Sequence, residues 1–205
     1  YLKIMYIKPW ITLGGLAAVL GLGGCQTLSN TTEKVSDQVT GLFSSKDKAP
    51  KIDKDGVVDI SKKTLEQLEK FTASMPTQQW VYIENEQLGR YQLKNKAQDG
   101  VILTLALHCK ISSQRPTFSL SSAEGKPLLK AYDPNAGQIQ FLLDNQNYGN
   151  PFNVHTDEPL KRFQAAIVQA KVIKIFNASR LYTFQNGNAD LLSKPVSCQE
   201  SGASS

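Results

Sequence analysis

The sequence predicts a mainly β (α+β) protein: an antiparallel, β-sandwich-like domain with one or two flanking helices, closed by a disulfide. Short stretches of alternating apolar and polar residues recur between residues 79 and 186, separated by glycine, proline, asparagine and aspartate. This pattern is typical of antiparallel sheets. Helical spacing is clear in one segment before this region and in one segment inside it, and two cysteines, Cys109 and Cys198, enclose most of the expected strands.

The clearest strand covers residues 101–111, with the sequence VILTLALHCKI. Its odd-numbered side chains are apolar and include Cys109, so they are expected to face the core, while Thr104, His108 and Lys110 face the other way. The same alternation predicts further strands at residues 79–85, 89–95, 116–122, 127–132, 137–145, 152–156, 171–178 and 180–186.

Two helices and one helical turn are expected beside these strands. The first follows a cap at Ser61 and ends before Pro76, with Leu65, Leu68 and either Phe71 or Thr72 on one face. The second covers residues 157–171, because acidic residues and a proline open a segment with apolar residues at helical spacing. Residues 188–194 are expected to form a last helical turn.

The chain divides into four expected parts. Residues 1–24 are a signal peptide, residues 25–60 a flexible polar tether, residues 61–200 the β-rich domain and residues 201–205 a disordered tail. The tether has too few apolar residues to bury a core. As a coil of about 35 residues it would span roughly 30–35 Å. Helical spacing of Leu28, Thr32, Val35, Val39 and Leu42 leaves a helix there open, although these are mostly weak helix formers.

The predicted signal peptide ends in a motif that indicates lipidation. The apolar run from Trp10 to Gly24 is shorter than the about 20 residues that a spanning helix needs, and it ends at Leu22-Gly23-Gly24-Cys25. This motif resembles the lipobox of bacterial lipoproteins. The resemblance implies cleavage between Gly24 and Cys25, with diacylglycerol and fatty acyl chains attached to Cys25. A free cysteine after an ordinary signal peptide or a short anchor is the alternative.

Several acyl chains would anchor the protein stably, because one chain alone binds a bilayer only marginally. By resemblance to enterobacterial lipoproteins, Gln26 in place of an aspartate favours the outer membrane, with the domain on the periplasmic face. Retention at the inner membrane and exposure at the cell surface stay open. The acyl chains are the only cofactor-like groups that we expect.

The net charge and the cysteine content argue against a nucleic-acid partner and against a metal site. The net charge is only +5, and the basic residues are scattered, so no nucleic-acid partner is expected. In an exported chain Cys109 and Cys198 most simply form a disulfide, with two free thiols as the alternative. Only these two cysteines and two histidines remain for metal ligation, so no metal site is expected.

The sequence does not predict an enzyme, and no catalytic residue is proposed. The two histidines, His108 and His155, could act as general bases only for a nucleophile, and the chain contains no G-x-S-x-G nucleophile elbow. Asp157 and Glu158 could be drawn as a carboxylate pair, but acidic residues at a helix start are better explained by the helix dipole.

A binding or assembly module of the cell envelope is the expected function. A binding face could come from strand aromatics, which are otherwise core residues: Trp80, Tyr82, Tyr91, Tyr148 and Phe152. The expected partners are the membrane, through the lipid anchor, and an envelope protein or peptidoglycan. The alternatives are an inhibitor or sensor lipoprotein that binds a cell-wall enzyme, and a lipid or glycan carrier. A deep apolar cavity would favour the carrier; the sequence leaves the oligomeric state open.

Five segments follow one another in a distinctive order: WVY (80–82), LTLALHC (103–109), GQIQFLLDN (137–145), RFQAAIVQAKVIKIF (162–176) and YTFQNGNADLLSKPVSC (182–198). Their order is similar to that in periplasmic accessory proteins of type VI secretion of the VasI/TagO kind. The similarity covers residues 78–198 and implies a small, disulfide-closed β domain in a secretion-system accessory. The chain departs from that family at His108, where an arginine is usual, and at residues 138–141, where an Arg-Phe-Asp strand is usual.

Overall fold

The computed structural model describes residues 48–109, 115–153 and 156–194. All of them belong to one unit of the chain, residues 41–205. The expectations for the signal peptide, Cys25, His155, Cys198 and the C-terminal tail lie outside the described residues.

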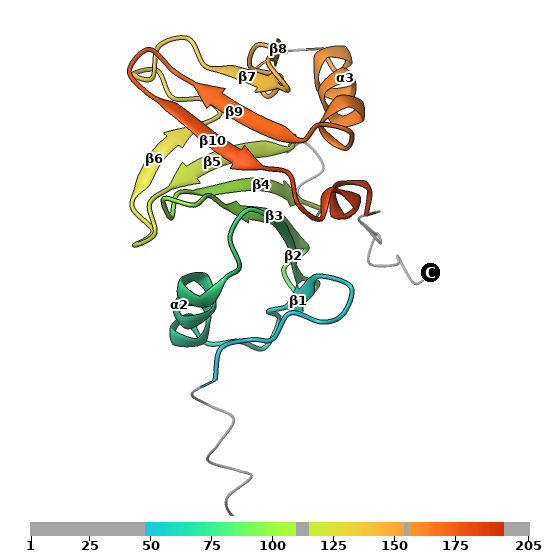
Figure 1. Cartoon of the computed structure of the whole chain (residues 1–205). Helices are drawn as coiled ribbons and strands as arrows, with labels where there is room; N and C mark the ends of the chain where they lie inside the picture. The colour runs from blue at the N-terminus through green and yellow to red at the C-terminus, as the bar shows by residue number, and fades with distance from the viewer. Residues whose placement is uncertain (1–47, 110–114, 154–155, 195–205) are drawn as a thin grey trace, which may run out of the picture. The chain divides into compact units, whose positions relative to one another are not determined.

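The expected mainly β architecture is confirmed: two sheets and two helices form the described domain (Figure 1). All strand pairs are antiparallel except β1 with β2, which is parallel. The six-stranded sheet has the order β1 (Val57–Asp59), β2 (Trp80–Asn85), β3 (Arg90–Lys96), β4 (Ile102–His108), β5 (Thr117–Ser121) and β6 (Pro127–Lys130). The four-stranded sheet has the order β10 (Leu181–Gln185), β9 (Val172–Phe176), β7 (Gln140–Leu143) and β8 (Gln146–Asn147).

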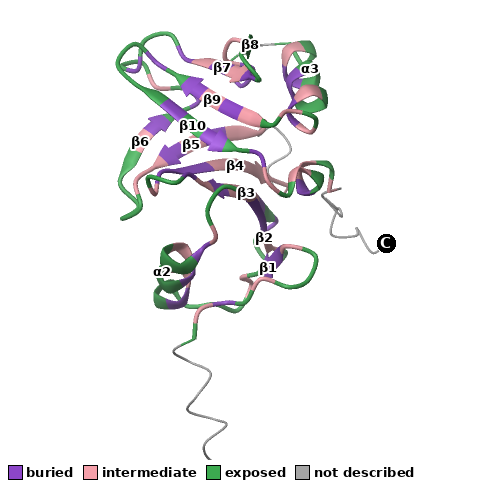
Figure 2. Ribbon diagram, in the orientation of Figure 1, coloured by how far each residue is buried: buried purple, intermediate pink, exposed green. Residues whose placement is uncertain are grey.

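The two sheets pack against each other across one apolar core, where buried residues of both sheets gather (Figure 2). Phe118 of β5 meets Phe141 of β7 edge to face, with ring centroids 4.8 Å apart. Helix α3 (Glu158–Ile167) adds Phe163, whose ring lies 5.2 Å from that of Phe141. Such edge-to-face pairs are favourable beyond the area that they bury.

The opposite face of the six-stranded sheet is partly covered by helix α2 (Leu65–Ser74). Phe71 of α2 and Met75 just after it pack on side chains of β1, β2 and β4 that point away from the two-sheet core. Both faces of the sheet are therefore covered at this end. For this reason residues 80–83 of β2 are all buried instead of alternating.

The tether ends earlier than the expected residue 60. Val57 and Val58 are buried in β1, and Ala49, Ile52 and Ile60 pack against the cluster under α2. Two adjacent valines in a polar segment give no strand periodicity. They form a strand here because β2 offers a parallel edge to pair with.

Helix α2 starts later than expected, and Ser61 is not its cap. Thr64 is the N-cap: its hydroxyl accepts a hydrogen bond from the Gln67 backbone at 3.3 Å, and the Gln67 side chain accepts one from the Thr64 backbone at 3.1 Å. This reciprocal pair is a capping box. Leu65, expected on the buried face, is 74% exposed.

Two strand expectations need correction. The strand expected at residues 137–145 is interrupted at Asp144 and Asn145, whose φ angles of 48° and 71° form the two-residue turn between β7 and β8. The strand expected at residues 152–156 is absent from its described part: Phe152 is buried in a turn. The other expected strands are present, most of them with shorter bounds, and the strand expected at residues 89–95 is shifted by one residue to Arg90–Lys96.

The second helix is shorter than expected, since α3 ends at Ile167, and residues 188–194 contain the 3-10 helix η1 (Ala189–Ser193). No helix among the described residues is long and apolar enough to cross a membrane.

Candidate binding groove

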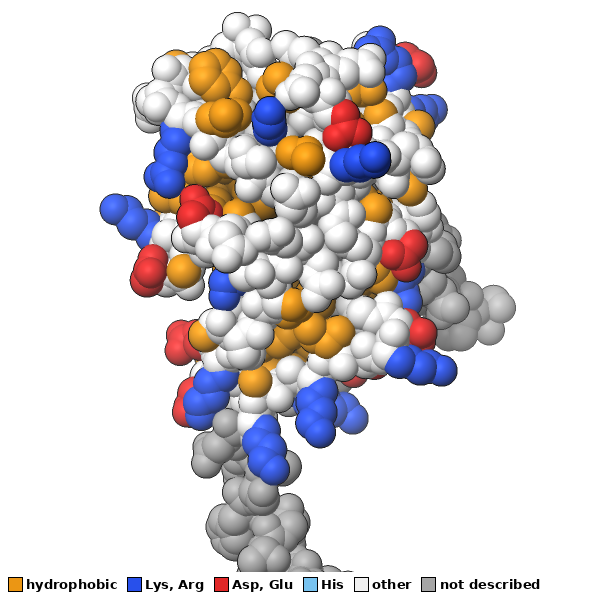
Figure 3. All heavy atoms as spheres, viewed as in Figure 1, with side chains coloured by type: hydrophobic (Ala, Val, Ile, Leu, Met, Phe, Trp, Pro, Cys, Tyr) orange, Lys and Arg blue, Asp and Glu red, His pale blue; other side chains and the backbone are white. Residues whose placement is uncertain are grey.

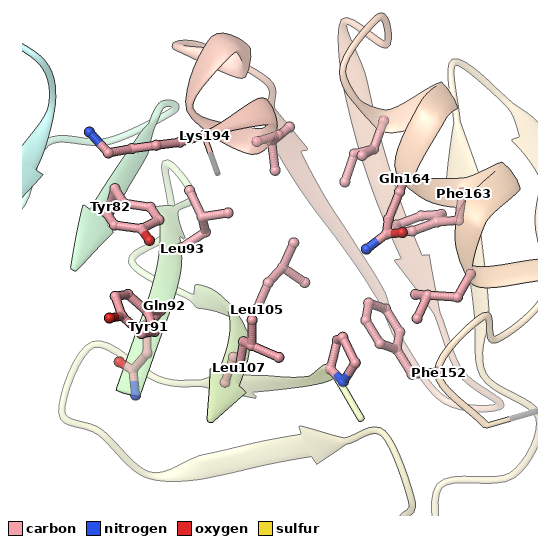
Figure 4. Close-up of a pocket in the computed structure, with 15 residues that line it drawn as sticks. Tyr82, Tyr91, Gln92, Leu93, Leu105, Leu107, Phe152, Phe163, Gln164 and Lys194 are labelled. Carbon is pink, nitrogen blue, oxygen red and sulfur yellow. The ribbon is translucent and has the colours of Figure 1, made fainter. Parts of the chain in front are cut away.

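A cavity of about 210 Å³, here called the inter-sheet groove, opens beside the two-sheet core (Figure 4). One wall comes from β2, β3 and β4, and the other from α3, η1 and the turn that holds Phe152. The residues that line the groove are Tyr82, Tyr91, Gln92, Leu93, Leu105, Ala106, Leu107, Pro116, Phe152, Leu160, Phe163, Gln164, Ile167, Leu192 and Lys194.

The wall formed by β3 and β4 is open because these strands extend beyond the fully buried two-sheet core. Leu103, Leu105 and Leu107 are alternate residues of β4 and share one face of the sheet. Leu103 is fully buried, whereas Leu105 and Leu107 are only half-buried. The register places Leu93 of β3 opposite Leu105 and Tyr91 opposite Leu107, which widens this apolar surface across two strands.

The helical wall is fixed by aromatic packing and by the start of α3. Phe163 packs against Phe152 with ring centroids 5.7 Å apart. Arg115 Nη2 donates to Asp157 Oδ1 at 2.8 Å and to the Thr156 carbonyl at 3.0 Å, just before α3 begins. Asp157 is therefore the partner of an arginine at the start of α3 and does not line the groove.

One end of the groove is polar. The Tyr82 and Tyr91 ring centroids lie 6.3 Å apart, and Lys194 Nζ lies 5.5 Å from the Tyr82 ring centroid. Burial raises the pKa of Tyr82 to about 12, and the nearby Glu84 carboxylate adds to the shift. Burial also raises the pKa of Glu84, while Lys194 opposes that shift. The Tyr82 hydroxyl therefore stays protonated near neutral pH, and it can donate a hydrogen bond.

The five predicted aromatic residues do not form one exposed face. Trp80 is fully buried, and its indole Nε1 donates to Asn186 Oδ1 at 2.6 Å. Tyr148 is half-buried against Phe163, outside the groove lining. The groove brings together the other three: Tyr82, Tyr91 and Phe152.

The sequence did not identify the leucines, Gln164 or Lys194 as site residues. Strand alternation shows which face Leu93, Leu105 and Leu107 share, but it does not show where the opposing sheet ends. Gln164 lies one position after a core residue on α3, and only the folded helix places it at the rim of the groove.

The residues considered for chemistry are not gathered in the groove. His108 and Glu158 are absent from its lining. Within the described part of the chain, no three histidine, cysteine, aspartate or glutamate side chains are grouped so that they could hold a metal ion. Cys109 follows β4 and packs, partly buried, against the core; its pairing with Cys198 stays a prediction because Cys198 lies outside the described residues.

Comparison with known protein families identifies the family of this chain. A family model described as YfjT matches residues 78–191, which is more than half of the 205-residue chain. Neither the curated proteins nor the solved structures include a significant match. The matched segment contains β2 to β10, and so it includes the strand wall and α3 but not β1 or α2.

Proposed function

The chain belongs to the YfjT family, and from this premise we propose that its β domain is a binding module of the cell envelope that receives a partner protein in the inter-sheet groove. The groove is the observation that carries the proposal, because the family match covers nearly all of its lining. The domain acts by contact and not by catalysis.

The size of the groove favours a partner's side chain over a carried ligand. Its volume of about 210 Å³ exceeds the roughly 150 Å³ of a cavity that takes up benzene. It is smaller than the about 300–1,000 Å³ of pockets that enclose drug-sized ligands. One bulky apolar side chain fits this space, and such an anchor in a desolvated pocket is typical of binding hot spots. A small-lipid or glycan carrier is therefore the second candidate, supported only by the apolar lining.

The polar end of the groove complements this anchor. The Tyr82 hydroxyl and the Lys194 ammonium can pair with carbonyl or carboxylate oxygens beside the anchoring side chain. An apolar wall with few polar groups favours a protein over peptidoglycan, which is a polar polymer. A secretion-system accessory, suggested by the VasI/TagO resemblance, and an inhibitor or sensor of a cell-wall enzyme are narrower forms of the same proposal.

We place this domain on a lipid anchor. The lipobox-like motif at Cys25 supports acylation, and residues 26–47 would link the anchor to the first described residue. A Cys109–Cys198 disulfide would then fix the segment after η1 to the end of β4. The proposed location is the periplasmic face of the outer membrane.

The groove proposal can be tested by photo-crosslinking in cells. A photo-reactive residue at Gln164, which is exposed and lines the groove, should give one dominant adduct with an envelope protein. The matched control is Lys161, also exposed on α3 but outside the groove lining. Equal adducts from both positions, or none from Gln164, would argue against the groove as the binding site.

The anchor is tested separately with a fatty-acid probe. Cys25→Ser should abolish labelling of the protein, whereas Cys109→Ser should leave it unchanged. Labelling that persists in Cys25→Ser would rule out acylation at this residue.

A further inference from the structure

The face of the six-stranded sheet that turns away from the two-sheet core carries a second cavity, of about 280 Å³, here called the α2–β3 groove. Its lining combines an apolar wall with two cations, and it contains no aspartate or glutamate. Figure 3 shows apolar side chains gathered between α2 and the neighbouring strands, with lysine and arginine side chains around this end. The apolar wall includes Leu68, Phe71 and Ile83, and the two cations are Arg90 and Lys94.

The two cations of this groove differ in their exposure. Arg90, Gln92 and Lys94 are alternate residues of β3, so their side chains point to the same face. Arg90 is exposed at the start of the strand, whereas Lys94 is half-buried in its middle. A ligand entering the groove would meet the guanidinium first and the ammonium further in.

The side chains of Lys94 and Lys96 differ in their hydrogen bonding to the described residues. Both lie on the same face of β3, and Lys96 Nζ donates to the Ala73 carbonyl at 2.9 Å, at the end of α2. The Lys94 ammonium makes no hydrogen bond or ion pair with any described residue. Burial lowers the pKa of its ammonium, and no nearby carboxylate opposes the shift. A half-buried, unpaired charge destabilises the fold, which is common where a residue serves binding.

We propose that the α2–β3 groove binds an amphiphilic anion, whose carboxylate or phosphate group pairs with Lys94 and whose apolar body packs on Phe71, Ile83 and Leu68. The anion would supply the charge partner that Lys94 lacks. Charge-assisted hydrogen bonds of this kind are about twice as strong as neutral ones. The side-chain amides of Asn85 and Gln92 offer further hydrogen-bond donors around the head group.

This site lies on the other face of the six-stranded sheet, and its lining shares only Gln92 with that of the inter-sheet groove. The side chains of Tyr91 and Leu93 point to one face of β3, and those of Arg90 and Lys94 point to the other. The α2 part of the wall also lies outside the YfjT match. An anion site here would therefore combine strands inside the matched segment, which carry Arg90 and Lys94, with a helix outside it.

The test uses the full-length protein in phosphatidylcholine nanodiscs and two soluble probes of similar shape, 4-phenylbutyrate and the neutral 4-phenylbutanol. Ligand-observed NMR should show that 4-phenylbutyrate binds at least about tenfold more tightly than 4-phenylbutanol. Phenyl phosphate serves as a third probe, to distinguish a phosphate head group from a carboxylate. Lys94→Gln should weaken anion binding at least about tenfold. Lys94→Met, which keeps an apolar side chain of similar length, should do the same.

Lys96→Gln is the matched control. It should lower the melting temperature, because the bond from Lys96 to α2 is lost, and it should leave the dissociation constant of 4-phenylbutyrate within about twofold of the wild-type value. Lys94→Gln should not lower the melting temperature. Equal binding of the alcohol and the acid, or no binding of either anion, would overturn the proposal. Unchanged anion binding in both folded Lys94 variants would overturn it as well.

Discussion

Among single residues, Asn186 connects more of the fold than any sequence pattern suggests. Its Oδ1 accepts from Trp80 Nε1, and its Nδ2 donates to the carbonyls of Ile167 and Ala170, both at 2.7 Å. These carbonyls lie at and just after the end of α3, where helical partners are missing. One buried amide therefore joins β2 of the large sheet to the helix that forms the other wall of the inter-sheet groove.

We predict that Asn186→Leu lowers the free energy of unfolding by about 2–6 kcal/mol. The substitution leaves two buried groups, the Trp80 indole and the Ile167 carbonyl, without this partner, and each unsatisfied buried group costs about 1–3 kcal/mol. Urea denaturation followed by circular dichroism measures the loss. Asn188→Asp is the control, because Asn188 is exposed and should change stability by less than about 0.5 kcal/mol. Equal stability of the two variants would show that Asn186 does not connect the sheet to α3.

Tyr82 should make stability depend on pH in the alkaline range. Its pKa of about 12 in the folded state lies above the ordinary value of 10. The folded state therefore retains a proton that the unfolded state loses, so this contribution is complete below pH 10 and is lost as the pH rises towards 12. Tyr82→Phe should remove this part of the decline, as measured by urea denaturation at several pH values. Parallel decline in the wild type and the variant would contradict the shift.

At the scale of elements, the sequence predicted most strands because their periodicity is local. Residues 101–111 and 180–186 alternate clearly, and β4 and β10 lie inside these ranges. Strand β1 and the capping of α2 were missed because they depend on partners that periodicity does not show. Val57 and Val58 need the edge of β2, and Thr64 caps the helix only together with Gln67.

A pair of alanine substitutions distinguishes the observed cap from the expected one. Thr64→Ala should lower the free energy of unfolding by about 1 kcal/mol, because the capping box loses its hydroxyl acceptor. Ser61→Ala, at the cap that the sequence suggested, should change it by less than about 0.5 kcal/mol. Chemical denaturation of the two variants decides; a larger effect at Ser61 would contradict the observed start of α2.

At the scale of the whole molecule, each face of the six-stranded sheet has its own cover and its own groove. The small sheet and α3 cover one face and leave the inter-sheet groove; α2 covers part of the other and leaves the α2–β3 groove. The sequence identified three aromatic residues of the first groove, Tyr82, Tyr91 and Phe152. It did not reveal the groove itself. The cavity arises where the strands of one sheet extend beyond the elements that cover them, and this difference in length is known only once the layers are packed.

The most direct test of the central claim is to fill the inter-sheet groove. Gln164→Phe places an aromatic ring at the groove, whereas Lys161→Phe places the same ring elsewhere on α3. Each anchored variant is crosslinked in membranes and the bound partner is quantified, with the melting temperature measured alongside. We predict that Gln164→Phe keeps or raises the melting temperature and loses the partner, while Lys161→Phe keeps both. A folded Gln164→Phe protein that still captures as much partner as Lys161→Phe would contradict the proposed role of the groove.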